Sequence, residues 1–155
     1  MNLRDFATWI QGHPDYRDSF VHYRFLPPRP ARYAVPPEMP EDLQRLMRSL
    51  ALDRLYSHQA EALSRIRGGA HLLMATPTAS GKSLVYNLAV LEEILAHSES
   101  RALYLFPLKA LEQDQMKALT PWLKGLGAPR VRAEIYDGDT TPYRRKKIRT
   151  DMPRI

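Results

Sequence analysis

Apolar positions from residue 41 onward follow two patterns, one typical of helices and the other typical of buried strands. Leu43, Leu46 and Met47 recur at helical spacing, and the acidic residues just before them favour a helix start through the helix dipole. Short continuous apolar runs are typical of strands that a parallel sheet buries on both faces. Helices are therefore predicted from residue 41, from Ser57 to Gly68, from Lys82, over 108–120 and from Pro142, and strands over 71–75, 101–106 and 131–136.

The order of these elements predicts the fold class. A β-α-β-α-β-α series with right-handed crossovers gives an α/β fold, in which helices flank a parallel sheet. Pro121 is expected to break or restart the helix over 108–120, because proline removes a backbone donor from a helix interior. Residues 152–155 stand where a fourth strand is expected to begin.

Residues 1–40 differ in composition from the rest, since they hold seven of the thirteen prolines. Proline biases the preceding residue toward extended geometry, so this part is predicted to be an extended arm with one short helix near residues 5–10. Its aromatic side chains indicate that it packs on something, because disordered segments are poor in aromatics. The predicted organisation is an arm over 1–40 and a globular part over 41–155.

Composition and charge narrow the class of protein further. The chain has 155 residues and no cysteine, which excludes disulfides and thiolate metal sites and suits a reducing compartment. No secretory signal and no membrane-spanning run are visible, so we expect a cytoplasmic protein without a membrane partner. Residues 141–155 carry six basic side chains and one acidic one, which accounts for five of the six net positive charges. This basic cluster indicates a polyanionic partner, with a solvated helix face as the alternative.

Gly81-Lys82-Ser83, placed between an apolar strand and an apolar helix, predicts a phosphate-binding loop. The N–H groups and dipole of a helix start suit a triphosphate, Lys82 would neutralise its β- and γ-phosphates, and the Ser83 hydroxyl would ligate Mg²⁺. Chance occurrence of the triplet is the alternative. The predicted ATP-binding residues are Gln59, Thr76, Pro77, Thr78, Ala79, Ser80, Gly81, Lys82, Ser83 and Leu84.

Two positions depart from the general form of such loops. Thr76 stands where the pattern has its first glycine, and Ala79 also replaces a glycine. Both are acceptable if their backbone φ angles are negative, which is the expectation here. Asp137, at the end of the third predicted strand, is a candidate for the acid that holds Mg²⁺. Polar Arg132 and Glu134 interrupt that strand, so the acidic partner is expected to be absent.

Four ordered segments, around 55–59, 75–88, 107–115 and 136–140, together resemble a known family. The chain is similar to the first RecA-like lobe of superfamily-two DEAD/DEAH-box helicases, and within them to the YprA/MrfA-type DNA repair helicases, relatives of the RecQ-like helicases. The resemblance implies a RecA-like P-loop fold for residues 41–155 and an ATP-dependent DNA helicase, with Mg²⁺ as cofactor and 3′-to-5′ polarity.

The resemblance also implies roles for single residues. Gln59 matches the glutamine that reads the adenine edge, although a buried amide that caps its own helix is the alternative. Tyr33 or Tyr56 could stack on the adenine, and the sequence does not choose between them. Segments matching those that hold single-stranded or 3′-tailed DNA contain Lys109, Ala110, Leu111, Gln113, Asp139, Thr140, Arg144 and Arg145. For Lys109 the alternative is a solvated surface lysine.

Three parts of this family are not recognisable in the sequence: the DExH motif, the second RecA-like lobe with its arginine finger, and the cysteine-bearing C-terminal module. We therefore expect a piece of a longer motor that works with the remaining helicase lobes and is catalytically inactive alone. The competing hypotheses are a non-catalytic nucleic-acid-binding or decoy module, and a small-molecule kinase, for which neither a lid nor a substrate pocket is visible.

Overall fold

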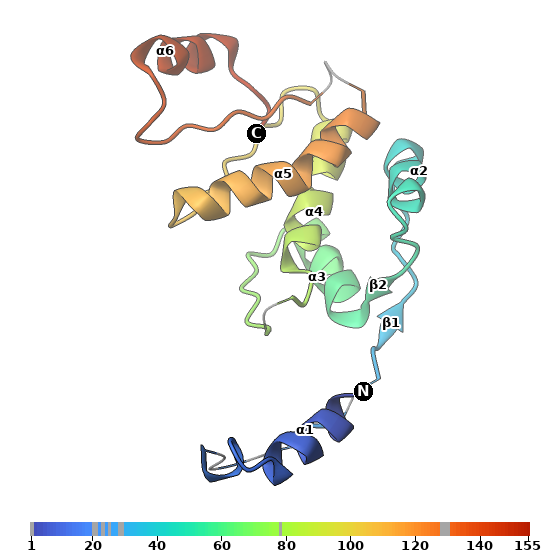
Figure 1. The fold of residues 1–155 in the computed structure, drawn as a ribbon. Coiled ribbons are helices and arrows are strands. Elements are labelled where there is room, and N and C mark those ends of the chain that lie inside the picture. Colours follow the sequence, from blue (N-terminus) through green and yellow to red (C-terminus); the bar gives the residue numbers. More distant parts are fainter. Residues whose placement is uncertain are drawn as a thin grey trace. The chain divides into compact units, whose positions relative to one another are not determined.

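A computed structural model describes residues 2–19, 22, 24, 26–27, 30–77, 79–127 and 131–155. Two compact units divide the chain, residues 1–31 and residues 32–155 (Figure 1). Residues 33 and 34 belong to the second unit, where they pair with residues 55 and 56. The functional division into an arm of 1–40 and a lobe of 41–155 stays a prediction.

The first unit contains the α-helix α1 (Leu3–Gly12) and a 3-10 turn, η1 (Arg17–Ser19). The Asn2 side chain caps α1 by accepting hydrogen bonds from the N–H groups of Arg4 and Asp5, at 3.0 and 2.9 Å. Trp9 stacks against Phe6 and contacts the rings of His13 and Tyr16. The predicted short helix is therefore confirmed, and its described aromatics pack on one another. The aromatics at positions 20, 23 and 25 lie outside the described residues.

Helices make up most of the second unit: α2 (Glu41–Ser49), α3 (Ser57–Arg67), α4 (Lys82–Ala96), α5 (Lys109–Gly125) and α6 (Pro142–Asp151) (Figure 1). Two short strands, β1 (Tyr33–Ala34) and β2 (Leu55–Tyr56), pair antiparallel, with Tyr33 opposite Tyr56. Every helix predicted for this unit is present, and the helix that follows the glycine-lysine-serine triplet begins at Lys82.

The core is formed mainly by residues of α2, α3, α4 and α5. Its least exposed side chains, at 2 % or below, are Leu43, Leu55, Leu63, Val85, Leu88 and Leu91. Five of them lie on helices that the sequence pattern predicted, and Leu55 lies in β2. Each buried leucine contributes about 1.5–3 kcal/mol. The α4 helix therefore has a buried inner side, and this fixes the position of the loop that precedes it.

The predicted parallel sheet is the main correction. Residues 71–75, 101–106 and 131–136 are extended, but none of these three segments is a strand. In the second of them Tyr104 is half-buried, whereas Leu103 and Leu105 are each 82 % exposed. A continuous apolar run suggested burial on both faces, but only one face is covered here. Without a neighbour at hydrogen-bonding distance along its length, an extended segment forms no ladder.

The beginning of a ladder does exist at residues 154 and 155. Ile155 N donates to Arg132 O at 3.2 Å and Glu134 N donates to Ile155 O at 3.0 Å, which is the slanted pattern of a parallel pair. On the other side, Ala102 N donates to Arg154 O at 2.8 Å. Residues 154–155 therefore lie between the second and third predicted strands, where the fourth strand was expected to begin.

Pro121 is a second correction, because α5 continues through it to Gly125. An interior proline costs a helix roughly 3 kcal/mol through its missing N–H group and its ring. Leu119 and Trp122 flank Pro121 and are both buried, so their packing holds the helix together across it. Tertiary packing outweighs the local preference at this position.

Candidate functional site

The predicted phosphate loop lies directly before α4, and Gly81 is its N-cap residue. The backbone of Gly81 is left-handed, with φ +74°, and a Cβ atom built there would overlap the Nε2 atom of Gln59. Only glycine satisfies both conditions without strain. The glycine of the triplet is therefore required by local geometry, independently of any ligand.

Lys82 is folded back over this loop. Its Nζ donates to the carbonyl oxygens of Thr76 and Pro77, both at 2.8 Å, while the Thr76 and Ser80 hydroxyls hydrogen bond to each other at 2.6 Å. Within the described part of the chain, no carboxylate forms an ion pair with Lys82. The loop thus holds a positive charge against neutral carbonyls without a counter-ion, and this suits a phosphate.

Ala79 departs from the sequence expectation. Its φ is +59°, in the left-handed region, although a negative angle was expected for a residue with a Cβ. Thr76 is not among the residues with positive φ, so its expectation is confirmed. Strained backbone of this kind costs about 1–3 kcal/mol and gathers at ligand-binding loops. Thr78, between these two positions, lies outside the described residues.

The first turn of α3 holds the loop from the other side. Gln59 is buried, at 3 % exposed; its Oε1 accepts from Tyr56 N at 2.8 Å and its Nε2 donates to Gly81 O at 3.0 Å. The side chain of His58 donates through Nε2 to Ser80 O at 3.0 Å. The amide of Gln59 therefore caps its own helix and fixes the loop, which was the alternative role. Its role at an adenine edge stays a prediction.

His58 was missed by the sequence analysis, which considered only its neighbour. The signal that could have found it is position: two consecutive polar side chains in the first turn of a helix can reach the same neighbouring segment. Ser57, where this helix was predicted to begin, is its first helical residue, and Tyr56 is the N-cap. The N–H of Ser57 donates to Arg32 O at 2.8 Å, so β1 and α3 are tied together there.

Two clefts flank the start of α4. One, of about 350 Å³, is lined by residues that include Tyr33, Tyr56, Gln59 and Ser83. The rings of Tyr33 and Tyr56 stack at 5.2 Å, and the ring of Tyr33 is the more exposed of the two. This cleft offers an aromatic surface beside the phosphate loop, as an adenine site requires.

The other cleft, of about 510 Å³, joins Lys82 and Ser83 to Phe106, Leu111 and Gln115. The Tyr86 hydroxyl crosses this region and donates to Gln115 Oε1 at 2.7 Å. Burial raises the pKa of Tyr86, so its hydroxyl keeps its proton. The cleft therefore reaches from the phosphate loop to α5, and a hydrogen bond connects α5 to α4, the helix that follows the loop.

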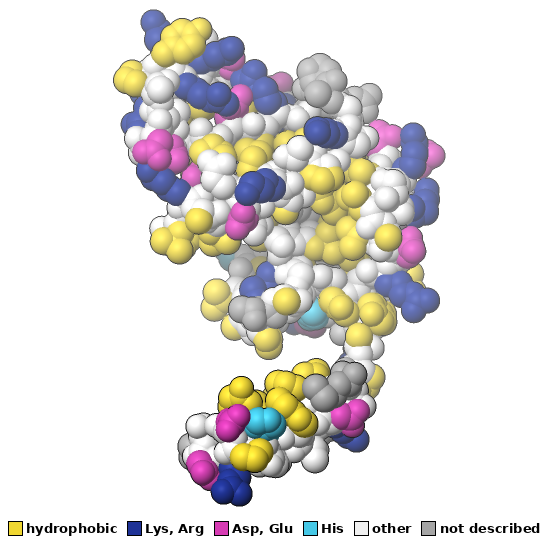
Figure 2. Space-filling view, in the orientation of Figure 1, with side chains coloured by type: hydrophobic (Ala, Val, Ile, Leu, Met, Phe, Trp, Pro, Cys, Tyr) yellow, Lys and Arg dark blue, Asp and Glu magenta, His cyan; other side chains and the backbone are white. Residues whose placement is uncertain are grey.

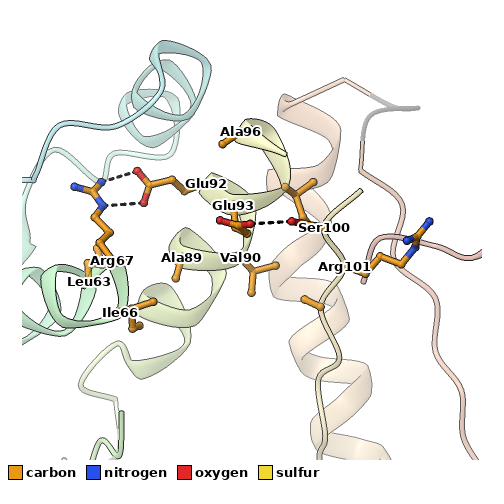
Figure 3. Close-up of a pocket in the computed structure, with 12 residues that line it drawn as sticks. Leu63, Ile66, Arg67, Ala89, Val90, Glu92, Glu93, Ala96, Ser100 and Arg101 are labelled. Atoms are coloured by element: carbon orange, nitrogen blue, oxygen red, sulfur yellow. Dashed lines mark hydrogen bonds and ion pairs between the residues drawn. The ribbon is translucent and has the colours of Figure 1, made fainter. Parts of the chain in front are cut away.

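A third cavity, of about 450 Å³, lies on a different side of α3 and α4 (Figure 3). Its rim carries a bidentate ion pair in which Arg67 binds both oxygens of Glu92, at 2.6 and 3.0 Å. Ile66, Ala89 and Val90 supply apolar lining. None of the sequence-predicted site residues lines this cavity, so we do not assign it to the site.

The two segments predicted to hold nucleic acid come together. Lys109, the first residue of α5, forms an ion pair with Asp139 at 2.7 Å. The hydrogen bond to Asp139 raises the pKa of Lys109. Ala110, Leu111 and Gln113 follow along the same exposed part of α5. Lys109 is exposed and its charge is already partly balanced by Asp139, and its role at nucleic acid stays a prediction.

Asp137 organises the turn that carries Asp139. Its Oδ1 accepts from the Thr140 hydroxyl at 2.8 Å and from Asp139 N at 3.0 Å, and the Thr140 hydroxyl oxygen accepts from Asp137 N at 2.9 Å. The bond from Thr140 is the main reason that the pKa of Asp137 is lowered. This carboxylate stabilises its own turn. The expected absence of an acidic partner for the metal stays a prediction. The part of the chain that the structure describes holds no cluster of three His, Asp or Glu side chains suited to a metal.

Arg144 and Arg145 also have internal partners. Arg144 Nη2 donates to Glu134 Oε2 at 2.6 Å. Arg145 donates to the carbonyl oxygens of Thr140 and Asp137, at 2.8 and 2.7 Å, and lies over the Tyr136 ring. Arg145 therefore holds the turn at 136–141 against α6, and Arg144 ties α6 to Glu134 in the segment before that turn.

A buttressed glycine-lysine-serine loop with a lysine over it and an adjoining aromatic cleft is typical of nucleotide-binding proteins of the P-loop class. The DEAD/DEAH box helicase family model matches residues 56–155, and the chain belongs to this family.

Curated relatives and a solved structure agree with this assignment. The chain is 39 % identical to the ATP-dependent helicase YprA of Bacillus subtilis over 149 residues, which are 96 % of this chain and 19 % of YprA. It is 34 % identical to the ATP-dependent helicase HRQ1 of Saccharomyces cerevisiae, covering 86 % of this chain and 12 % of HRQ1.

The crystal structure of the DUF1998 helicase MrfA bound to DNA and AMPPNP superposes with a TM-score of 0.84 at 36 % identity, over 96 % of this chain and 20 % of that one. The chain thus spans about a fifth of the length of YprA and MrfA. None of the helices in the described ranges is long and apolar enough to cross a membrane.

Proposed function

We propose that this chain is the ATP-binding part of an ATP-dependent DNA helicase, which binds ATP with Mg²⁺ at residues 76–83 and the backbone of single-stranded DNA near Lys109 and Asp139. The observation that carries the proposal is Lys82, a cation that pairs with no carboxylate among the residues the structure describes, in a loop that its neighbours already shape. The names of the relatives support the class of activity, and the MrfA structure shows that MrfA binds DNA and AMPPNP together. From the resemblance we extend the proposal to 3′-to-5′ movement in DNA repair.

The residues of the loop fit a magnesium triphosphate. Lys82 Nζ now donates to two neutral carbonyls, and phosphate oxygens offer negative acceptors for the same protons. The Ser83 hydroxyl in the first turn of α4 would hold Mg²⁺, which supplies charge neutralisation on the phosphates when bound. Gln59 and His58 keep the loop carbonyls of Gly81 and Ser80 turned toward α3. The base of ATP would lie in the cleft beside Tyr33.

Lys82→Ala tests nucleotide binding directly, in a titration of the 155-residue chain with a fluorescent ATP analogue and Mg²⁺. Hydrogen bonds to charged groups contribute about 1.5–3 kcal/mol, so affinity is expected to fall roughly 10- to 100-fold. Lys124→Ala removes an exposed lysine near the end of α5 and is expected to leave binding unchanged. A wild-type chain that does not bind the analogue, or an unaffected Lys82→Ala variant, would contradict the proposal.

We further propose that the 155-residue chain binds ATP without turning it over. Hydrolysis in this class needs an acid that holds the metal, an oriented water and a positive clamp on the developing charge. The proposal is supported by Asp137, whose carboxylate is committed to its own turn. Phosphate release stimulated by single-stranded DNA in the purified chain would overturn this part. DNA binding that persists without any nucleotide binding would favour the decoy-module hypothesis instead.

A further inference from the structure

The α6 helix has no buried residue and carries most of the net charge of the chain. It lies at one end of the second unit, joined by extended connections on both sides (Figure 1). Figure 2 shows Lys and Arg side chains gathered over that end of the molecule. Packing into the core therefore does not explain why the exposed side chains of α6 are basic.

The six basic side chains of residues 141–155 fall into two sets. Three have internal partners: Arg144 and Arg145 as described above, and Arg154, whose Nη2 donates to His97 O at 3.0 Å at the C-terminal end of α4. The other three, Lys146, Lys147 and Arg149, form no hydrogen bond or ion pair within the described ranges.

Helical geometry places two of these three cations on one face. At 3.6 residues per turn, positions 143, 146, 147 and 150 fall within an arc of about 100°. The half-buried residues Arg145 and Ile148 lie on the opposite side, toward the rest of the unit. We call Tyr143, Lys146, Lys147 and Thr150 the outer face of α6. All four are exposed, and Tyr143 is 79 % exposed.

This face is held in place at both ends of the helix. Arg145 ties the first turn of α6 to the 136–141 turn, and Arg132 Nη2 lies 3.3 Å from Asp151 Oδ2 in the last turn. Met152 N closes the helix by donating to Ile148 O at 2.9 Å. Side chains on an element that is already ordered lose less entropy when they bind a partner.

The charges around the neighbouring 136–141 turn differ from those on the outer face of α6. Lys109 is paired with Asp139, and the carboxylate of Asp137 and the guanidinium of Arg145 belong to the same turn region, so these four groups together carry no net charge. Arg144 and Glu134 cancel as a pair. The segment assigned to DNA under the proposed function therefore offers no net attraction for phosphates, and the free positive charge lies on α6.

We propose that the outer face of α6 binds the sugar–phosphate backbone of the DNA next to the stretch held near Lys109, with Lys146 and Lys147 as the phosphate contacts. This inference rests on the proposed function. Lysine ammonium groups act as point charges, so the contact carries no sequence preference and weakens with salt. The exposed Tyr143 ring and Thr150 hydroxyl suit the same surface, because aromatic and hydroxyl side chains recur at backbone contacts.

The test is fluorescence anisotropy of labelled single-stranded DNA with the 155-residue chain and with the double variant Lys146→Ala/Lys147→Ala, in the presence of an ATP analogue. Each lost phosphate contact lowers the slope of log K against log salt by roughly 0.7. For the double variant, the slope of log K against log salt is therefore expected to be smaller in magnitude by roughly 1.4. The variant is expected to bind DNA roughly 25-fold more weakly at about 0.1 M salt.

Lys117→Ala/Lys124→Ala is the matched control, because it removes the same charge from exposed positions of α5. It is expected to change affinity by no more than about twofold. Thermal melting of all variants checks that α6 and the core stay folded. An equal loss of affinity in both double variants, or an unchanged slope for Lys146→Ala/Lys147→Ala, overturns the inference.

Two further outcomes separate this inference from the proposed function. If the wild-type chain binds the ATP analogue and DNA while the α6 variant binds both equally well, only the inference fails. If the wild-type chain binds neither ligand, the proposed function fails and takes the inference with it. Equal binding of wild type to poly-glutamate and to DNA would mean that the face recognises acidic protein, and this also overturns the inference.

Discussion

The two parts of the site are held together by different forces. The phosphate loop is fixed by hydrogen bonds from the buried Gln59 and the half-buried His58, and its Lys82 pairs with no carboxylate among the described residues. The 136–141 turn is fixed by exposed charges that cancel, as in the pair of Lys109 and Asp139. Exposed pairs contribute little and weaken in salt, whereas buried hydrogen bonds do not. The loop is therefore shaped before it meets a ligand, while the turn depends on α6 for attraction.

Gly81→Ala is expected to have the largest effect, because it disrupts the preshaped phosphate loop. The left-handed φ costs about 1–2 kcal/mol for an L-residue, and the displaced Gln59 amide loses a hydrogen bond of about 1 kcal/mol. The unfolding free energy is expected to fall by about 2–3 kcal/mol in denaturant titrations, together with a loss of ATP-analogue binding.

Gly69→Ala is the control for that loss. Gly69 has a similar φ of +79° but no atom within 4 Å of the added Cβ. It is expected to lose about 1–2 kcal/mol through backbone strain alone and to keep nucleotide binding. If both variants lose the same stability and both still bind nucleotide, the contact between Gly81 and Gln59 does not shape the loop.

The difference between the two parts also explains what the sequence could predict. Local features were predictable: the stripe of Leu43, Leu46 and Met47 on α2, and the start of α4 at Lys82. These depend on residues within one or two turns, where dipole, propensity and periodicity act. The pairing of Lys109 with Asp139 joins segments that are thirty positions apart, and only the family resemblance suggested that both belong to one surface.

The three predicted strands that do not form are explained in the same way, because strand pairing also joins segments that are far apart in the sequence. The apolar run over 101–106 was a sound local signal, but a ladder needs a partner that local sequence cannot guarantee. Residues 154–155 supply that partner over one hydrogen bond on one side and a short parallel pair on the other. The role of His58, and the left-handed Ala79, likewise depend on the position of α3 against the loop.

Ala79→Gly also tests the phosphate loop, with a smaller expected change in stability. Glycine relieves the left-handed strain at φ +59°, partly offset by the greater freedom of the unfolded chain, so stability is expected to rise by about 0.5–1 kcal/mol. Ala51→Gly is the matched control outside the loop, at φ +56°, and is expected to give a similar gain. Denaturant titrations measure both. A loss of stability at Ala79 beside a gain at Ala51 would show that the loop needs this residue for more than its backbone angle.

The smallest expected effect concerns the charged part of the comparison and depends on pH. Chiefly because the Thr140 hydroxyl donates to Asp137, the folded pKa of this carboxyl is below its ordinary value of 3.8. A group with a lowered folded pKa stabilises the protein above the unfolded pKa, and this contribution disappears as pH falls through the folded pKa. Asp137→Asn is therefore expected to lower the melting temperature slightly at neutral pH, with the gap to wild type closing below about pH 4. Thr140→Val keeps the carboxylate but removes its main hydrogen bond, so its gap should close over the same range. A gap that stays constant from neutral to acidic pH would show that the charge of Asp137 does not hold the turn.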